Sequence, residues 1–197
     1  MRAAPILFAA VALATGSHAA SAQESSASET LGVAGSAPQV CTIDTARIRA
    51  GELVNFVGLD GDTLRVIDLT TSDDLSVQAA SADLRFDAVC NFPHRVRLES
   101  QENGLWPISG PVAPTTPDFA TALPYLVRLN WADRTQLLEV DARVRRNSVV
   151  FTDIDTPASG EMELRVQIDA GASNTQVGAP VLAGAYSDTL RIYLEPR

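Results

Sequence analysis

Segments in which apolar and polar residues alternate recur along the chain from residue 40 onward. The most regular segment carries Leu123, Tyr125, Val127, Leu129 and Trp131 at alternate positions. A period of two places successive side chains on opposite faces of a β-strand, so each segment predicts a strand with one face in a core. The predicted strands lie within residues 53–57, 64–69, 84–90, 96–98, 123–131, 137–144, 149–151, 162–168 and 190–194.

Turn signals separate these predicted strands. Residues 58–62, GLDGD, predict a hairpin, Asn103-Gly104 ends another segment, and residues 107–117 form a proline-rich loop. No window keeps a helical period, and residues 133–146, which come closest, suit a strand equally well. The pattern therefore predicts one all-β domain, a β-sandwich, over residues 40–197.

The last predicted strand follows a turn signal at Ser187-Asp188. Leu190, Ile192 and Leu194 alternate with Arg191 and Tyr193 near the end of the sequence. A strand with this pattern pairs into a sheet on at least one side, so we expect its neighbours to come from earlier in the chain. Its other edge is then expected to need a partner from elsewhere.

The first residues have the three parts of a secretory signal peptide. Arg2 gives a positive start, residues 6–14 are apolar, and residues 20–22 are small, which predicts a signal peptide over residues 1–22 and cleavage before Gln23. No later segment is apolar enough over a sufficient length to predict an integral membrane segment. We therefore expect a secreted protein.

Residues 23–39 form an extension rich in serine, alanine, glycine and glutamate. Such a composition buries too little apolar surface to order itself, and it predicts a flexible linker. Leu31 and Val33 nevertheless alternate, so a short extended piece that pairs with a sheet is a second interpretation.

The net charge limits the classes of partner that the chain is expected to bind. The chain has 24 acidic residues against 15 basic ones, all arginine, and a formal net charge of −9, which argues against nucleic acid and anionic lipid as partners.

The chain has two cysteines, Cys41 and Cys90, and an even pair in an exported chain predicts one disulfide.

Residues suited to catalysis are few. His94 is the only histidine beyond the predicted signal peptide, it follows Pro93 in a predicted turn, and no nucleophile motif accompanies it. We expect a surface turn residue there, a protein that is not an enzyme, no catalytic residues and no cofactor. A hydrolase that uses His94 is the remaining enzyme interpretation.

Three pairs of carboxylates fall in predicted turns, at residues 60/62, 73/74 and 153/155. Aspartate favours such turns because its side chain hydrogen-bonds to nearby backbone, and the spacing falls short of an EF-hand loop. We therefore expect turn chemistry and no metal. A place in the core is the favoured interpretation for both tryptophans, but Trp106, before Pro107, is less constrained than Trp131 and is a candidate exposed ligand contact.

Four short motifs resemble one known family: Cys90-Asn91, residues 100–105 (SQENGL), Leu123-Pro124-Tyr125, and residues 183–190 (AGAYSDTL). In this order they are similar to the spore coat protein U family, the secreted pilin-like domain of archaic chaperone-usher systems in Gram-negative bacteria. The resemblance covers roughly residues 41–197, and none of its motifs is catalytic.

The resemblance implies an immunoglobulin-like β-sandwich that lacks its last strand. Leu190, Ile192 and Leu194 would line an acceptor groove, and Leu31 and Val33 would belong to a donor strand that fills the groove of a neighbouring subunit. Implied partners are neighbouring copies or related pilin subunits, a periplasmic chaperone and an outer-membrane usher. The implied location is the periplasm in transit and then the cell surface or a fimbrium.

We therefore expect a structural subunit of a secreted fibre assembled by donor-strand exchange. The alternative is a self-contained secreted sandwich that binds a ligand such as a carbohydrate through residues 106–117.

Overall fold

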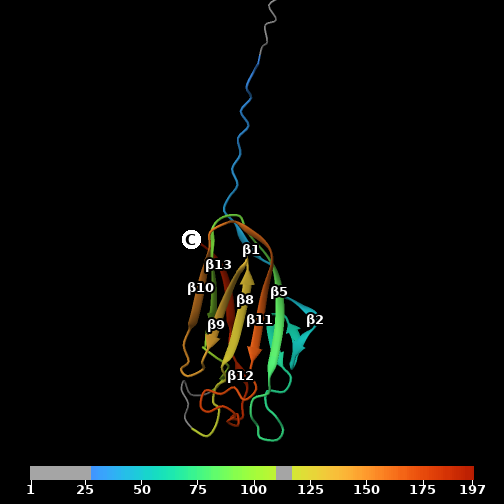
Figure 1. The fold of residues 1–197 in the computed structure, drawn as a ribbon, viewed down its shortest axis with the longest axis vertical. Coiled ribbons are helices and arrows are strands. Elements are labelled where there is room, and N and C mark those ends of the chain that lie inside the picture. The colour runs from blue at the N-terminus through green and yellow to red at the C-terminus, as the bar shows by residue number, and fades with distance from the viewer. Residues whose placement is uncertain (1–27, 110–116) are drawn as a thin grey trace, which may run out of the picture. The chain divides into compact units, whose positions relative to one another are not determined.

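A computed structural model describes residues 28–109 and 117–197, except for the side chains of residues 49–52 (Figure 1). The chain divides into two units, Met1–Ser36 and Ala37–Arg197. In the first unit, residues 28–36 have no regular secondary structure, and the predicted signal peptide lies outside the described residues. The second unit contains every described strand.

The larger sheet of the second unit has six strands, all paired antiparallel, in the order β1-β5-β11-β8-β9, with β2 also pairing β5. The register shifts between β2 and β5, after Ile48. These strands are β1 (Cys41–Ile43), β2 (Arg47–Val54), β5 (Ala80–Cys90), β8 (Tyr125–Trp131), β9 (Arg134–Val140) and β11 (Ala158–Ile168).

The smaller sheet has three antiparallel strands in the order β10-β6-β13. They are β6 (His94–Ser100), β10 (Ser148–Ile154) and β13 (Leu190–Pro196). Two short pairs complete the unit: β3 (Phe56–Asp60) with β4 (Thr63–Val66), and β7 (Trp106–Pro107) with β12 (Tyr186–Ser187).

The core lies between inward faces of the two main sheets, and alternation along the strands builds it. In β8, Val127 and Leu129 are at most 1% exposed, while Arg128 between them is exposed. Leu98 of β6 is fully buried in the same apolar cluster. The described residues contain no helix, and the prediction of an all-β sandwich is confirmed.

Two local predictions change in the structure. The predicted hairpin around residues 58–62 exists, but its first arm begins at Phe56, because Asn55 has a φ of 57° and separates β2 from β3. The Asn55 amide hydrogen-bonds to the backbone of Asp68, which stabilises this break. The strand predicted within residues 137–144 is β9, which begins earlier, at Arg134, and ends at Val140.

His94 is fully buried, so the prediction of a surface turn residue is wrong. Strand β6 begins at His94 itself, and the histidine therefore continues the inward face that carries Val96. Its Nε2 accepts a hydrogen bond of 2.9 Å from Trp131 Nε1, and its Nδ1 lies 2.9 Å from the Phe92 carbonyl oxygen. Both ring nitrogens are thus occupied within the core.

The predicted disulfide joins Cys41 to Cys90. Strands β1 and β5 pair in a register that places these residues directly opposite each other, with a Cα–Cα distance of 4.2 Å. Because β1 has only three residues, the disulfide is a main link between this short strand and the rest of the sheet.

We predict that a Cys41→Ser/Cys90→Ser variant is less stable by about 2–5 kcal/mol, since removing a native disulfide frees the unfolded chain. Urea unfolding followed by tryptophan fluorescence measures the difference. Reduction should lower the midpoint of the wild type and leave the variant unchanged. Equal midpoints for oxidised wild type and variant would contradict the prediction.

Candidate functional site

Strand β13 lies at the edge of the smaller sheet. On one side it pairs with β6 along its whole length, from Leu190 opposite Ser100 to Pro196 opposite His94. On its other side, no strand of the described residues pairs with it. Unpaired backbone groups along a strand edge are ready to pair with another chain.

The inward side chains of β13 are less buried than those of its neighbour. We call Leu190, Ile192 and Leu194, together with the unpaired side of β13, the β13 edge. All three pack against the core but remain partly exposed, whereas Val96 and Leu98 of β6 are 2% and 0% exposed. The β13 edge is therefore apolar but only half covered.

Some inward side chains of the larger sheet, on the same side of the sandwich, are also incompletely buried. Strand β1 lies close to β13 without hydrogen-bonding to it. Ile43, Ile48 and Phe86, from β1, β2 and β5, are also only partly buried. These three side chains of the larger sheet are thus incompletely covered, like the inward side chains of β13.

The outward side of β13 is tied to β6 by charge and aromatic contacts. The Arg97 guanidinium lies 3.7 Å from the Tyr193 ring centroid and 2.7 Å from the Glu195 carboxylate. The hydrogen bond that Arg97 donates to Glu195 raises the pKa of Arg97, so the guanidinium stays protonated. These contacts hold β13 in its sheet while its far edge is open.

Asp188, just before β13, is the centre of a hydrogen-bond network. Its Oδ2 accepts bonds from Ser100 Oγ (2.6 Å), Tyr125 Oη (2.7 Å) and the Gly104 backbone N–H (3.2 Å). Its Oδ1 accepts one from the Glu102 backbone N–H (2.9 Å). Three of the four short motifs singled out in the sequence therefore meet at one carboxylate.

The turn between β6 and β7 is fitted closely to this network. Asn103 has a φ of 56° and donates through Nδ2 to Asp141 Oδ1 at 2.7 Å. At Gly104, with a φ of 137°, an added Cβ would lie 2.5 Å from the Ala142 Cβ, so only glycine fits. This turn packs too closely to admit a ligand.

Tyr125 donates its hydroxyl proton to Asp188 from a buried position. Burial, and next the negative charge of Asp188, raise the pKa of Tyr125 well above its ordinary value. The phenol therefore stays protonated and continues to donate. Because the network bonds its polar groups to one another, its geometry favours a structural role over a catalytic one.

The structure places Trp106 inside the protein, so the prediction of an exposed ligand contact is wrong. Its side chain is 0% exposed and packs with Ala122 and Ala142 in a small second core. The reason is the pairing of β7 with β12, in which Trp106 lies opposite Ser187. Trp131, 4% exposed, lies in the main core as predicted.

Leu31 and Val33 lie in the first unit and are 86% and 91% exposed. They belong to a stretch without regular secondary structure. These two apolar side chains of the extension are therefore available to pack against another surface. Their predicted part in a donor strand stays a prediction.

The carboxylate pairs lie mostly where the sequence predicts them, with two exceptions. Asp60 is the last residue of strand β3, so its placement in the turn itself is wrong. Asp153 lies in strand β10, and its carboxylate pairs with Arg95 at 2.7 Å, so its placement in a turn is wrong. The described parts of the chain contain no group of three or more potential metal-ligating side chains. Nor do they contain a helix suited to crossing a membrane.

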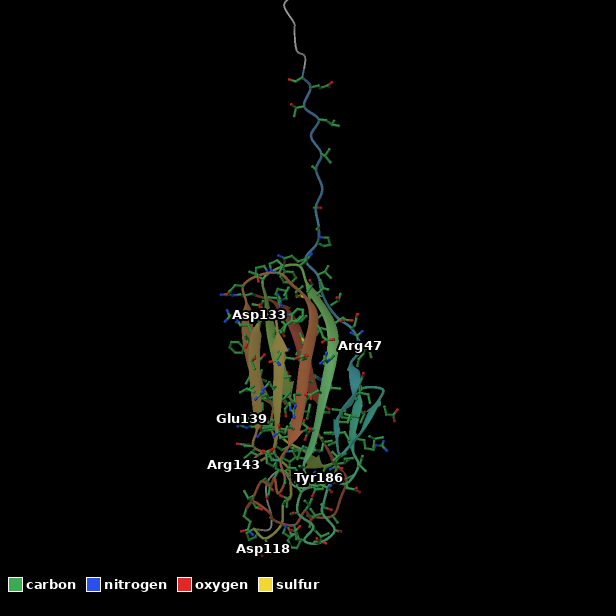
Figure 2. The ribbon with its side chains drawn as sticks, turned by 45° about the vertical axis from the view of Figure 1, so that its right-hand side comes forward. Arg47, Asp118, Asp133, Glu139, Arg143 and Tyr186 are labelled. Carbon is green, nitrogen blue, oxygen red and sulfur yellow. A yellow bond between two sulfur atoms is a disulfide. The ribbon has the colours of Figure 1, made fainter. Side chains whose placement is uncertain are left out.

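We predict that Asp188→Ala lowers the free energy of unfolding by about 2–4 kcal/mol, because buried donors lose a charged acceptor. Asp118→Ala is the matched control: Asp118 is exposed at the loop end of the second unit (Figure 2) and should change stability by less than about 0.5 kcal/mol. Urea unfolding measures both. Similar values for the two variants would contradict the structural role of the network.

No protein-family model matches this chain, and a search of curated proteins finds no match. The β13 edge, the Asp188 network and the disulfide are therefore the features from which its function is inferred.

Proposed function

We propose that this chain is a structural subunit of a secreted surface fibre, in which each copy donates an N-terminal strand to the β13 edge of the next. The single observation that carries the proposal is the β13 edge itself, which combines an unpaired strand side with half-covered apolar side chains. On this proposal the domain is an immunoglobulin-like sandwich that lacks its last strand.

A strand added beside β13 would satisfy two needs together. Its backbone would hydrogen-bond to the free side of β13, and its alternate side chains would cover Leu190, Ile192 and Leu194. Fully burying one such aliphatic side chain is worth about 1.5–3 kcal/mol, so completing three half-buried ones is a substantial gain. The same strand would cover the larger sheet's end at Ile43, Ile48 and Phe86.

The extension of a neighbouring copy is the proposed donor. Leu31 and Val33 are two residues apart, so in an extended strand they share a face, and both are almost fully exposed here. Gly32 and Gly35 meet no atoms within 4 Å where a Cβ would stand, so this stretch is free of close packing. Because donor and acceptor are different surfaces of one chain, the contact is heterologous and extends into a filament.

The proposal includes partners that act before assembly. A periplasmic chaperone would supply a temporary strand to the β13 edge, and an outer-membrane usher would exchange it for the next subunit's extension. The fibre would then stand on the cell surface, and the protein would need neither a catalytic residue nor a cofactor. The alternative, a ligand-binding sandwich, loses Trp106, the residue on which it chiefly rested, because that side chain is buried.

We predict that Ile192→Asp abolishes polymers, because it places a charge where an apolar side chain must dock. Val149→Asp is the matched control, since Val149 is an exposed apolar residue facing outward on the opposite edge strand of the same sheet. Light scattering after size exclusion, on chains purified from a periplasm, measures the mass. The control should polymerise like the wild type.

Two further samples guard against a folding defect. The first is a chain that begins at Ala37, which should be monomeric and should bind a synthetic peptide of residues 23–36. The second is the same chain with Ile192→Asp, which should keep its disulfide but should not bind the peptide. Polymers of wild-type size from the Ile192→Asp chain, or from the chain that begins at Ala37, would overturn the proposal.

A further inference from the structure

Two arginines lie directly opposite each other on the outer face of the larger sheet. Arg165 of β11 is the cross-strand partner of Arg128 of β8, and both side chains are exposed. Like charges in this position destabilise a sheet unless something compensates them. Asp83, on the far side of Arg165, lies 3.1 Å from its guanidinium and compensates one of the two charges.

Arg128 has no such partner. Three other arginines on this face pair with carboxylates: Arg47 with Asp87, Arg85 with Glu161, and Arg165 with Asp83. Arg128 makes no ion pair or hydrogen bond within the described residues, although the chain carries nine more acidic than basic residues. The outward carboxylate of the next strand, Glu139, stands opposite Leu126, whereas Leu137 stands opposite Arg128.

A hollow of about 280 Å³ lies at this arginine pair, lined by Leu126, Arg128, Arg165 and Gln167. It combines two guanidinium groups, an amide and one aliphatic side chain. The Gln167 amide nitrogen hydrogen-bonds to Asp169 Oδ1 at 2.7 Å, which restrains its orientation and leaves its second N–H and its oxygen free. The hollow therefore offers positive charge, polar groups and an apolar wall within one small area.

We propose that this hollow binds an acidic sugar, with its carboxylate between Arg128 and Arg165. Arginine is suited to this role because its planar fork matches the two oxygens of a carboxylate. A sugar hydroxyl would bond to the Gln167 amide, and a C–H face of the ring would contact Leu126. The ligand's charge would supply the compensation that the protein does not provide for Arg128. This site is on the outer face of the larger sheet and is independent of the β13 edge.

Saturation-transfer difference NMR on the full chain tests the site, since this measurement suits weak ligands and works for monomers and polymers alike. Galacturonate is the probe, and galactose is the neutral control. We expect a signal for galacturonate that falls with added salt and with competing sulfate, and none for galactose. Arg128→Gln should reduce the galacturonate signal at least fivefold.

Arg134→Gln is the matched control, because Arg134 is exposed on the same sheet and also lacks an ion pair within the described residues. It should bind galacturonate like the wild type. The unfolding midpoint of Arg128→Gln should be no lower than that of the wild type, since the substitution removes the repulsion from Arg165. Retention of the chain on immobilised polygalacturonate distinguishes a polysaccharide ligand from a free sugar acid. Equal galacturonate signals from wild type and Arg128→Gln, or a galactose signal of the same size, would overturn the proposal.

Discussion

A β-strand can hydrogen-bond to a neighbouring strand on each of its two sides. Strand β13 does so on only one side within the described chain. Its pairing with β6 fixes the position of Leu190, Ile192 and Leu194 at the margin of the core, and its free side leaves them half covered. Ile43, Ile48 and Phe86 of the larger sheet are likewise only partly buried. A missing strand in the smaller sheet would explain both the unpaired backbone and the incomplete burial, and this is the physical basis of the proposed fibre.

The hydrogen bonds of Asp188 stabilise the segment that leads into β13. One carboxylate collects donors from the turn after β6 and from the first residue of β8, and it lies two residues before β13 begins. It therefore sets where β13 starts relative to its neighbours. The three motifs that meet at Asp188 therefore position this part of the chain, since their polar groups hydrogen-bond to one another.

Predictions from the sequence succeeded where a local pattern sufficed and failed where distant segments decided burial. Alternation located β5, β8, β11 and β13, and the two cysteines predicted the disulfide. Trp106 and His94 were misjudged, because loop pairing covers the first and the start of β6 turns the second inward. Asp153 likewise gained its partner, Arg95, only from an adjacent strand.

The period-two pattern, the turns and the cysteine pair can be read from the amino-acid order, because each depends on residues close together or on residue type alone. The folded chain was needed to show that β13 is an edge strand, that Asp188 joins three motifs, and that Arg128 lies opposite Arg165. Strand order and register arise from pairing between segments far apart in the chain, and the alternation within a single strand does not specify its neighbour.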